Sequence, residues 1–145
     1  MITVAISGGF DPLHVGHIDL INRAKALGDK LIVILNNDNW LIAKKGFAFM
    51  NEAERKAVLE ALRNVDEVII TNHQKNPADM SVCAELKMLK PNIFANGGDR
   101  KADNIPEYQL CDELGIKMVF NLGDKIQSSS ELVNRALGIK SRALK

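Results

Sequence analysis

Ser-Gly-Gly-Phe-Asp-Pro-Leu-His-Val-Gly-His, residues 7–17, decides the fold because it joins a strand pattern to a helix pattern. Residues 2–7 form a short apolar run, which predicts a buried strand. The helix that follows carries an apolar stripe at Ile18, Ile21, Ala24 and Leu27. The turn between them therefore lies at a helix amino end, where unpaired N–H groups and a partial positive charge bind anions.

Two histidines begin this helix. His14 and His17 are three positions apart, so their imidazoles lie on one face of the first turn. Two imidazoles directed at an anion site suggest a phosphate that undergoes reaction. The alternative interpretation is that His14 caps the helix and His17 is an ordinary surface residue.

The rest of the chain alternates between strand and helix patterns. Further strands are predicted at residues 31–35, 68–70, 93–95 and 117–121. Helices are predicted from Asn51 onward and at residues 78–89, 105–114 and 129–137, with a polar break at 36–39 and a loop at 43–50. This alternation predicts a three-layer α/β/α, Rossmann-like fold with a five-stranded parallel sheet and right-handed crossovers.

Polar segments follow four of the predicted strands, at residues 7–17, 36–39, 96–100 and 122–130. The carboxyl ends of parallel strands meet at one edge of the sheet, and ligands of such folds bind there. We therefore expect these segments to form one site.

Length, charge and cysteine content restrict the classes of protein to which the chain can belong. The chain has 145 residues, a net charge of +1 and 26% charged residues, which predicts a single domain without the broad basic face of a nucleic-acid-binding protein. Cys83 and Cys111 fall in predicted helices without metal-ligand spacing, so we expect reduced core cysteines and no metal site. No leader peptide or membrane-spanning run is evident, which favours a cytoplasmic protein without a membrane partner.

Residues 9–17 resemble the signature of the HxGH nucleotidyltransferases, the cytidylyltransferase-like superfamily. A second signature of that superfamily, a serine-rich turn before the last helix, is matched at residues 126–132. The similarity continues at residues 44–46, 50–55, 65–68 and 97–99. It implies a nucleotidyltransferase domain at residues 1–137, followed by a basic tail at 138–145.

The resemblance also implies a reaction. In this superfamily a phosphate monoester attacks the α-phosphorus of a nucleoside triphosphate, pyrophosphate leaves, and no covalent enzyme intermediate forms. Catalysis then consists of positioning and of stabilising the charge that develops on the phosphates. The resemblance implies CTP or ATP with Mg²⁺ on the triphosphate, a small sugar, polyol or amino-alcohol phosphate as acceptor, and a homodimer.

Residue roles are carried over from the matching motifs. The catalytic residues are His14, His17 and Lys44. The nucleotide-binding residues are His14, His17 and a set from both signatures and the intervening loops: Gly9, Phe10, Asp11, Gly16, Lys45, Gly98, Asp99, Ser128, Ser129 and Ser130. The acceptor-binding residues are Asp38, Lys44, Asp66, Lys75 and Arg100. Lys44 and Lys45 are expected on a loop that folds over the phosphates.

Several of these residues have simpler interpretations. The serine run is common at a helix N-cap, and two adjacent lysines are common in a solvated turn. Asp66 can be a helix-to-strand corner, and Lys75, like His73, can lie in a solvated loop. Trp40 is expected to pack on a helix face rather than to stack on a base.

The substrate pair stays open. Residues 45–55 and 63–68 look like cytidylyltransferases of glycerol or choline phosphate, whereas residues 96–99, 105–107 and 121–124 look like the heptose-phosphate adenylyltransferase domain. CTP is slightly favoured over ATP, although Lys125 stands near the place of a cytidylyl arginine. A catalytically silent nucleotide-binding regulator is the alternative of another class. A dinucleotide-binding Rossmann protein is disfavoured because residues 7–13 lack G-x-G-x-x-G.

Overall fold

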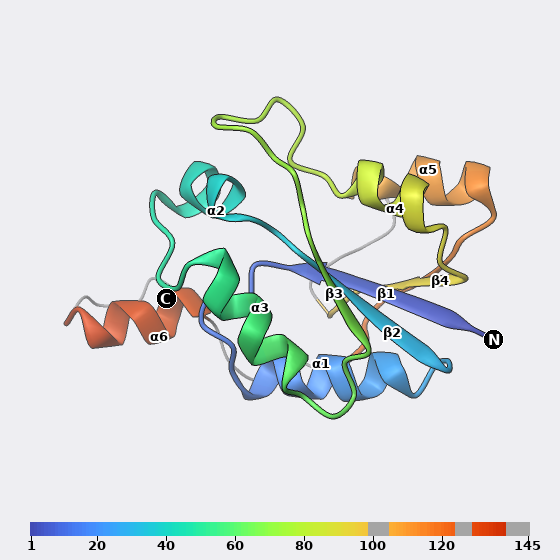
Figure 1. Ribbon diagram of the computed structural model, residues 1–145, viewed down its shortest axis with the longest axis horizontal. Helices are drawn as coiled ribbons and strands as arrows, with labels where there is room; N and C mark the ends of the chain where they lie inside the picture. The colour runs from blue at the N-terminus through green and yellow to red at the C-terminus, as the bar shows by residue number, and fades with distance from the viewer. Residues whose placement is uncertain (99–104, 124–128, 139–145) are drawn as a thin grey trace.

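The computed structural model describes residues 1–98, 105–123 and 129–138 (Figure 1). Strands and helices alternate along the chain, with two helices between β2 and β3. The strands are β1 (Thr3–Gly8), β2 (Lys30–Leu35), β3 (Glu67–Ile70), β4 (Ile93–Ala95) and β5 (Lys117–Val119). The helices are α1 (Val15–Lys25), α2 (Asp38–Lys45), α3 (Glu52–Glu60), α4 (Cys83–Leu89), α5 (Glu107–Leu114) and α6 (Ser129–Ala136).

The five strands form one parallel sheet in the order β3-β2-β1-β4-β5, which confirms the predicted sheet. Val4 of β1 pairs with Leu31 on one side and with Ile93 on the other. The chain proceeds outward from β1 to β3 and then crosses to β4 on the far side of β1. This reversal places the ligand-binding crevice outside the carboxyl ends of β1 and β4.

Apolar residues on the two faces of the sheet form two cores. Figure 1 shows α1 and α3 on one face, with α4 and α5 on the other. The first core is centred on residues from β1, β2, α1 and α3: Val4, Ile6, Ile21, Ala24, Leu31, Val33 and Leu59. The second packs α4 and α5 on the opposite face: Ala5, Ile34, Leu86, Phe94 and Cys111. Alternate residues of β1 thus enter different cores, as the strand period requires.

Helix α2 differs from expectation. The predictions of a polar break at 36–39 and of a loop at 43–50 are wrong where α2 covers these residues, because Asn37 and Gly46 cap a helix there. The Asn37 side chain accepts the Trp40 N–H at 3.0 Å, and Gly46 ends the helix at a φ of 89°. Leu41 is the one buried residue of α2, so no apolar stripe revealed it.

Helix α4 begins later than the predicted residue 78. Asp79 Oδ1 accepts the Ser81 N–H at 2.8 Å, which closes a local turn that competes with a helical start. The other predicted elements appear with boundaries shifted by a few residues, and β5 ends at Val119.

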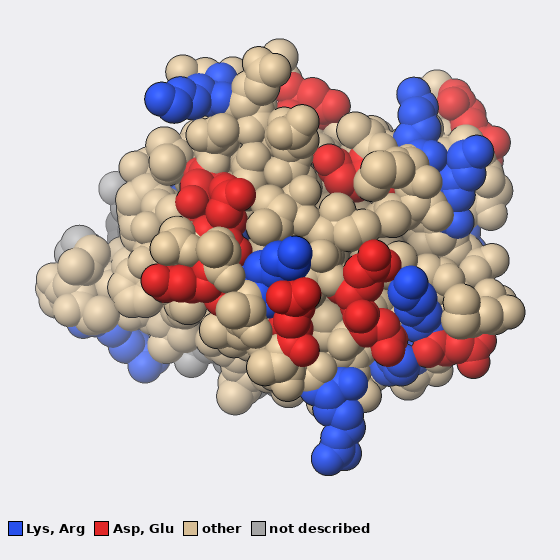
Figure 2. All heavy atoms as spheres, viewed as in Figure 1, with Lys and Arg blue, Asp and Glu red and all other residues tan. Residues whose placement is uncertain are grey.

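Charged side chains of both signs are interspersed over the face shown in Figure 2. Within the described ranges, no helix has the length and apolar character needed to cross a bilayer.

Candidate active site

The two histidines cap the amino end of α1. His14 is the N-cap residue, and its Nδ1 accepts the Gly16 N–H at 3.0 Å. His17 Nδ1 in turn accepts the His14 N–H at 3.2 Å. The imidazoles are stacked with ring centroids 3.8 Å apart. Each histidine therefore has its Nδ1 engaged by the backbone, and Nε2 is the ring nitrogen that these two hydrogen bonds do not use.

These hydrogen bonds determine where the protons lie. A nitrogen that accepts an N–H carries no proton, so each neutral imidazole holds its proton on Nε2. Burial lowers the pKa of His17 to about 3, helped by the neighbouring His14 and Lys45. Burial and then Lys45 lower the pKa of His14 as well. At neutral pH the lowered pKa values favour the uncharged form of both imidazoles, each with its proton on Nε2.

The lowered His17 pKa predicts a pH dependence of stability. The unfolded chain binds a proton below about pH 6.5, whereas folded His17 stays neutral to about pH 3, so stability falls as pH decreases through this window. From pH 7 to pH 5 the wild type should lose about 2 kcal/mol more unfolding free energy than His17→Gln. Urea unfolding at both pH values measures the difference, and equal losses in the two proteins contradict it.

Two predicted nucleotide contacts are revised by this geometry. The Gly16 N–H is donated to His14 and is thereby taken from the anion site. The Phe10 ring is 4% exposed and lies edge-on to the His17 ring at 4.8 Å, so only its main chain remains for a nucleotide. Phe10 orients His17 instead.

Arg55 of α3 holds the loops around the site together, a role that its place in the sequence does not reveal. Its side chain is 1% exposed. The guanidinium donates to Gly9 O at 2.8 Å, Asn36 O at 2.6 Å and Met50 O at 2.9 Å, and it pairs with Asp38 at 2.7 Å. One buried side chain thereby joins the carboxyl ends of β1 and β2 to both ends of the α2 region.

The two aspartates predicted to bind substrates serve the fold in this structure. Asp11 is 2% exposed, and its carboxylate accepts the N–H groups of Phe49 at 2.6 Å and Met50 at 2.7 Å. Asp38 is paired with Arg55. Both carboxylates fix the α2–α3 connection beside the anion site.

The two lysines lie on the last turn of α2, which corrects the expected mobile loop. Lys44 Nζ lies 5.1 Å from the centroid of the Trp40 ring. Burial lowers the pKa of Lys45, while Asp11 opposes the shift. Lys45 also contributes, after burial, to lowering both histidine pKa values, which places it on the histidine side of the site.

Helix α6 lies on the same side of the site as the histidines and Lys45. The Ser129 hydroxyl donates to Pro12 O at 2.8 Å, so the start of α6 lies against the turn that precedes α1. A cavity of about 320 Å³ lies between the two segments, lined by Asp11, Lys44, Lys45, Phe47, Val133 and Asn134. Ser130 follows in the first turn of α6, its side chain outside the described part. Ser128, Asp99 and Arg100 also lie outside the described residues.

The loops after β4 and β5 approach each other closely at Gly98. A Cβ at Gly98 would lie 2.9 Å from the Gly123 carbonyl oxygen, which is closer than side chains tolerate. A Cβ at Gly9 would lie 2.8 Å from a Leu41 methyl group. Glycine at these positions thus allows backbone to line the crevice directly.

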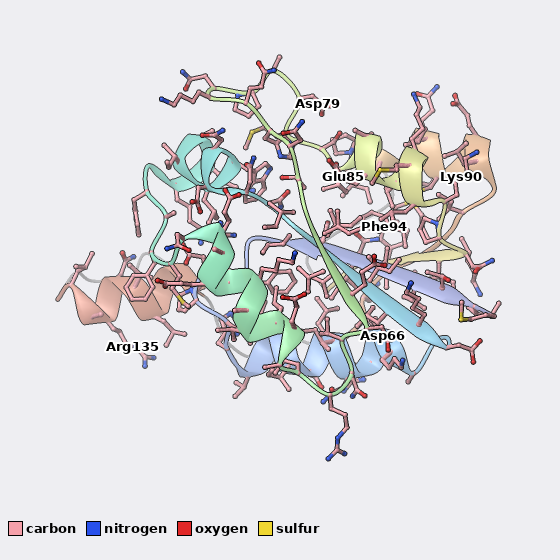
Figure 3. All side chains as sticks on the ribbon, in the orientation of Figure 1. Asp66, Asp79, Glu85, Lys90, Phe94 and Arg135 are labelled. Atoms are coloured by element: carbon pink, nitrogen blue, oxygen red, sulfur yellow. The ribbon has the colours of Figure 1, made fainter. Side chains whose placement is uncertain are left out.

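Two predicted acceptor-binding residues lie elsewhere. Asp66 stands at the amino end of β3, where its carboxylate pairs with Lys25 and accepts the Leu31 N–H at 2.7 Å (Figure 3). The prediction for Asp66 is therefore wrong, because the ligand crevice is at the opposite edge of the sheet.

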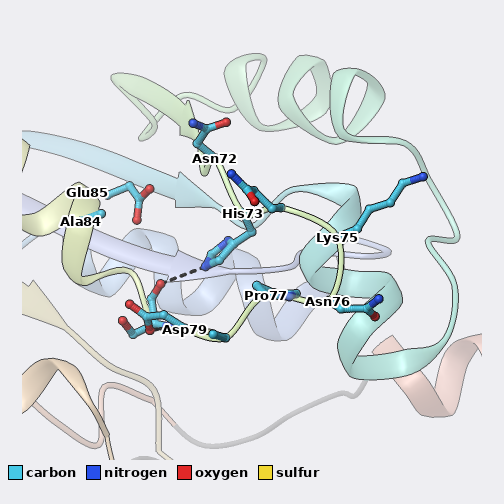
Figure 4. A pocket seen from close by; sticks show the side chains of 11 residues that line it. Asn72, His73, Lys75, Asn76, Pro77, Asp79, Ala84 and Glu85 are labelled. Carbon is cyan, nitrogen blue, oxygen red and sulfur yellow. Dashed lines mark hydrogen bonds between the residues drawn. The ribbon is translucent and has the colours of Figure 1, made fainter.

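Lys75 is exposed in the β3–α4 loop. Figure 4 shows its side chain directed away from His73, on the rim of a shallow cavity of about 530 Å³. The His73 ring bonds to Thr71 Oγ1 at 2.8 Å and to the Ser81 carbonyl at 3.0 Å. Neither side chain is joined to the histidine pair in this structure.

The geometry defines a class of protein: a parallel α/β fold in which two histidines begin a helix at the topological switch point of the sheet. A model of the cytidylyltransferase-like family matches residues 5–132. The chain belongs to this family and is an enzyme of the nucleotidyltransferase class, which confirms the resemblance.

Relatives with several names match the chain. It is 40% identical to the FAD synthase of Pyrococcus abyssi over 118 residues, 81% of this chain and 76% of that protein. It is 31% identical to the bifunctional protein HldE of Desulfatibacillum aliphaticivorans over 80% of this chain and 23% of that protein. The ethanolamine-phosphate cytidylyltransferase of Arabidopsis thaliana is 32% identical over 81% of this chain and 28% of that protein.

A solved structure matches the fold as well. The lipopolysaccharide core biosynthesis protein from Thermoplasma volcanium GSS1 superposes with a TM-score of 0.68 at 29% identity, over 83% of this chain and 95% of that chain.

Proposed function

We propose that this protein transfers a nucleotidyl group, preferentially AMP from ATP, to a small phosphate monoester and releases pyrophosphate. The observation that carries the proposal is the stacked pair of histidines at the amino end of α1, each with its Nδ1 accepting a backbone N–H, and with Lys45 near enough to contribute to lowering both pKa values. Uncharged donors in fixed positions suit charge that grows on a phosphate, because they need no reorganisation during the reaction.

The reaction is a direct displacement. An acceptor phosphate oxygen forms a bond to the α-phosphorus, while the bond from that phosphorus to the oxygen bridging to the β-phosphate breaks. His14 and His17 donate hydrogen bonds to the triphosphate, and Lys45 balances its charge. Lys44 lines two cavities, the one bounded by α6 and a second one that Trp40 also lines. In this position it can hold the attacking phosphate.

Mg²⁺ enters this proposal as part of the nucleotide substrate. Among the described residues, no group of three or more His, Cys, Asp or Glu side chains is arranged to hold a metal ion. Asp11, the carboxylate of the anion site, already accepts two backbone N–H groups. The donor set thus fits an ion held by phosphate oxygens and water.

Relatives support ATP as the nucleotide. Three matching proteins of 38–42% identity are named FAD synthase, and FAD contains an adenylyl group joined to a flavin phosphate. The 32% identical ethanolamine-phosphate cytidylyltransferase supports CTP, but at lower identity. The acceptors that these names imply share a phosphate ester on an alcohol carbon.

A matrix of nucleotides and acceptors tests the proposal. ATP, CTP, GTP and UTP are each combined with FMN, ribitol 5-phosphate, glycerol 3-phosphate, a sugar 1-phosphate and ethanolamine phosphate, with Mg²⁺ present. Pyrophosphate release with ATP and at least one acceptor is expected. Nucleotide binding by calorimetry without pyrophosphate from any pair would instead establish a silent regulator.

The two lysines should affect different substrates. We expect Lys44→Met to raise the KM of the acceptor about 10-fold and Lys45→Met to raise the KM of the nucleotide about 10-fold, because each removes one charge-assisted contact. Lys87→Met, on the exposed surface of α4, is the matched control and should change neither. Steady-state kinetics with each substrate varied in turn measures the effects. The assignment fails if both variants alter the same KM.

A further inference from the structure

The third histidine of the chain, His73, lies in the β3–α4 connection and has no part in the proposed reaction. Its ring contacts both ends of this connection. Nδ1 lies 2.8 Å from Thr71 Oγ1, and Nε2 lies 3.0 Å from the Ser81 carbonyl oxygen, the contact drawn in Figure 4. A carbonyl oxygen only accepts, so Nε2 carries the ring proton and Nδ1 accepts from the Thr71 hydroxyl. The imidazole therefore fixes the two ends of the connection relative to each other.

The β3–α4 connection in turn holds the amino end of α2. Asn37, the N-cap residue of α2, donates its N–H to Thr71 Oγ1 at 3.0 Å and its side-chain amide to the His73 carbonyl at 2.8 Å. Asn39, in the first turn, donates to the same carbonyl at 2.9 Å. The main chain of His73 thus binds α2 while its ring closes the connection.

Trp40 extends these contacts to Lys44, the residue proposed to hold the attacking phosphate. The Trp40 indole N–H donates to the Met80 carbonyl at 2.8 Å. Met80 directly precedes Ser81, whose carbonyl oxygen is bound by the His73 ring. Lys44 Nζ lies 5.1 Å from the centroid of the Trp40 ring, within the range of a cation–π interaction. A continuous series of contacts therefore joins His73 to Lys44.

On the basis of the proposed function, we infer that His73 is a positioning residue, which holds Trp40 in place and thereby places Lys44 for the acceptor phosphate. Lys44 needs such support because a lysine has a flexible four-carbon stem, whereas transfer depends on how the attacking oxygen is placed. Lys45 has Asp11 as its opposite charge instead. We therefore expect acceptor binding, and not nucleotide binding, to depend on His73.

Acceptor kinetics test this dependence, with ATP, Mg²⁺ and the acceptor that the wild type uses best. His73→Phe keeps a ring but removes both of its hydrogen bonds. It should raise the KM of the acceptor about 5-fold, the effect of one or two hydrogen bonds, and leave the KM of ATP unchanged. Asn72→Ala, an exposed neighbour in the same connection, is the matched control and should change neither. An unchanged acceptor KM in folded His73→Phe, or equal increases in both KM values, contradicts the inference.

A double-mutant cycle separates positioning of Lys44 from a merely structural role. In a Lys44→Met background, His73→Phe should change the acceptor KM by less than about 2-fold, because the side chain that His73 positions is gone. The same increase of about 5-fold in both backgrounds would show that His73 acts independently of Lys44, and would overturn the inference.

Two conservative variants identify the hydrogen bond responsible. The amide of a glutamine at position 73 can replace the Nε2–H toward the Ser81 carbonyl, whereas that of an asparagine stands in only for Nδ1. His73→Gln should therefore keep the acceptor KM within about 2-fold of the wild type, and His73→Asn should raise it about 5-fold. The reverse order contradicts the inference. This pair also decides the matter if His73→Phe fails to fold.

Trp40 provides a readout that requires no activity, because it is the only tryptophan of the chain. In folded His73→Phe we expect fluorescence emission at longer wavelength and stronger quenching by acrylamide, since the indole is no longer held against the connection. His73→Gln should keep the wild-type emission. Wild-type emission and quenching in His73→Phe refute the inference alone. Absence of pyrophosphate from the wild type with every nucleotide and acceptor refutes the proposed function, a result that the fluorescence comparison does not share.

Discussion

Replacing His17 by alanine is expected to lower kcat by about 10²–10³, because removal of one preorganised donor to a transition-state charge has an effect of that size. The substitution also removes the acceptor of the His14 N–H, which should cost about 1 kcal/mol of stability without unfolding the domain. Pyrophosphate release at saturating nucleotide and acceptor measures the rate, and circular dichroism confirms the fold.

Val15→Ala is the matched control for this substitution. Val15 begins the same helix, is 63% exposed and has no place in the site. It should retain wild-type turnover. A folded His17→Ala protein with wild-type kcat would remove the histidine pair from the mechanism.

Replacing Arg55 by alanine should reduce the free energy of unfolding by about 3–5 kcal/mol. The change leaves Asp38 without its ion-pair partner and takes a donor from three carbonyl oxygens, two of which end the central strands. The loss is large because Arg55 is fully enclosed, unlike a surface ion pair.

Urea unfolding measures this loss, with Arg63→Ala as the control. Arg63 is exposed beyond α3, and its removal should change stability by no more than about 0.5 kcal/mol. An Arg55→Ala protein as stable as the control would show that other contacts hold the loops together.

Much of the fold was predictable because its causes are local. Buried strands such as β2 are continuous apolar runs, and α1 has a repeating apolar stripe. Helix α2 was missed because its stability depends on two caps and a single buried residue, Leu41, rather than on a stripe. Periodicity cannot detect a helix of that kind.

The site was predictable where its residues are close in sequence. His14 and His17 cap one helix turn, so spacing alone brings them together. Their capping role and their proposed chemical role are compatible, since Nδ1 serves the first and Nε2 the second. Arg55 received no role because its partners are distant: it reaches Gly9 across 46 positions.

Asp66 was predicted to bind the acceptor from the family resemblance, although its place in the sequence just before a strand indicated otherwise. It precedes its strand, and a residue before a parallel strand lies at the amino edge of the sheet, away from the ligand crevice. Its position relative to β3 therefore contained the information needed to exclude it.

The central claim is that two neutral imidazoles donate their Nε2–H groups to a bound triphosphate. Long-range ¹H–¹⁵N NMR of the histidine side chains tests this directly, because the chain has only 3 histidines. At pH 7 we expect His14 and His17 as neutral, Nε2-protonated tautomers whose Nε2 resonances shift on addition of a non-hydrolysable ATP analogue with Mg²⁺, while those of His73 do not. Protonation on Nδ1, or nucleotide binding that leaves both Nε2 resonances unmoved, would contradict the account.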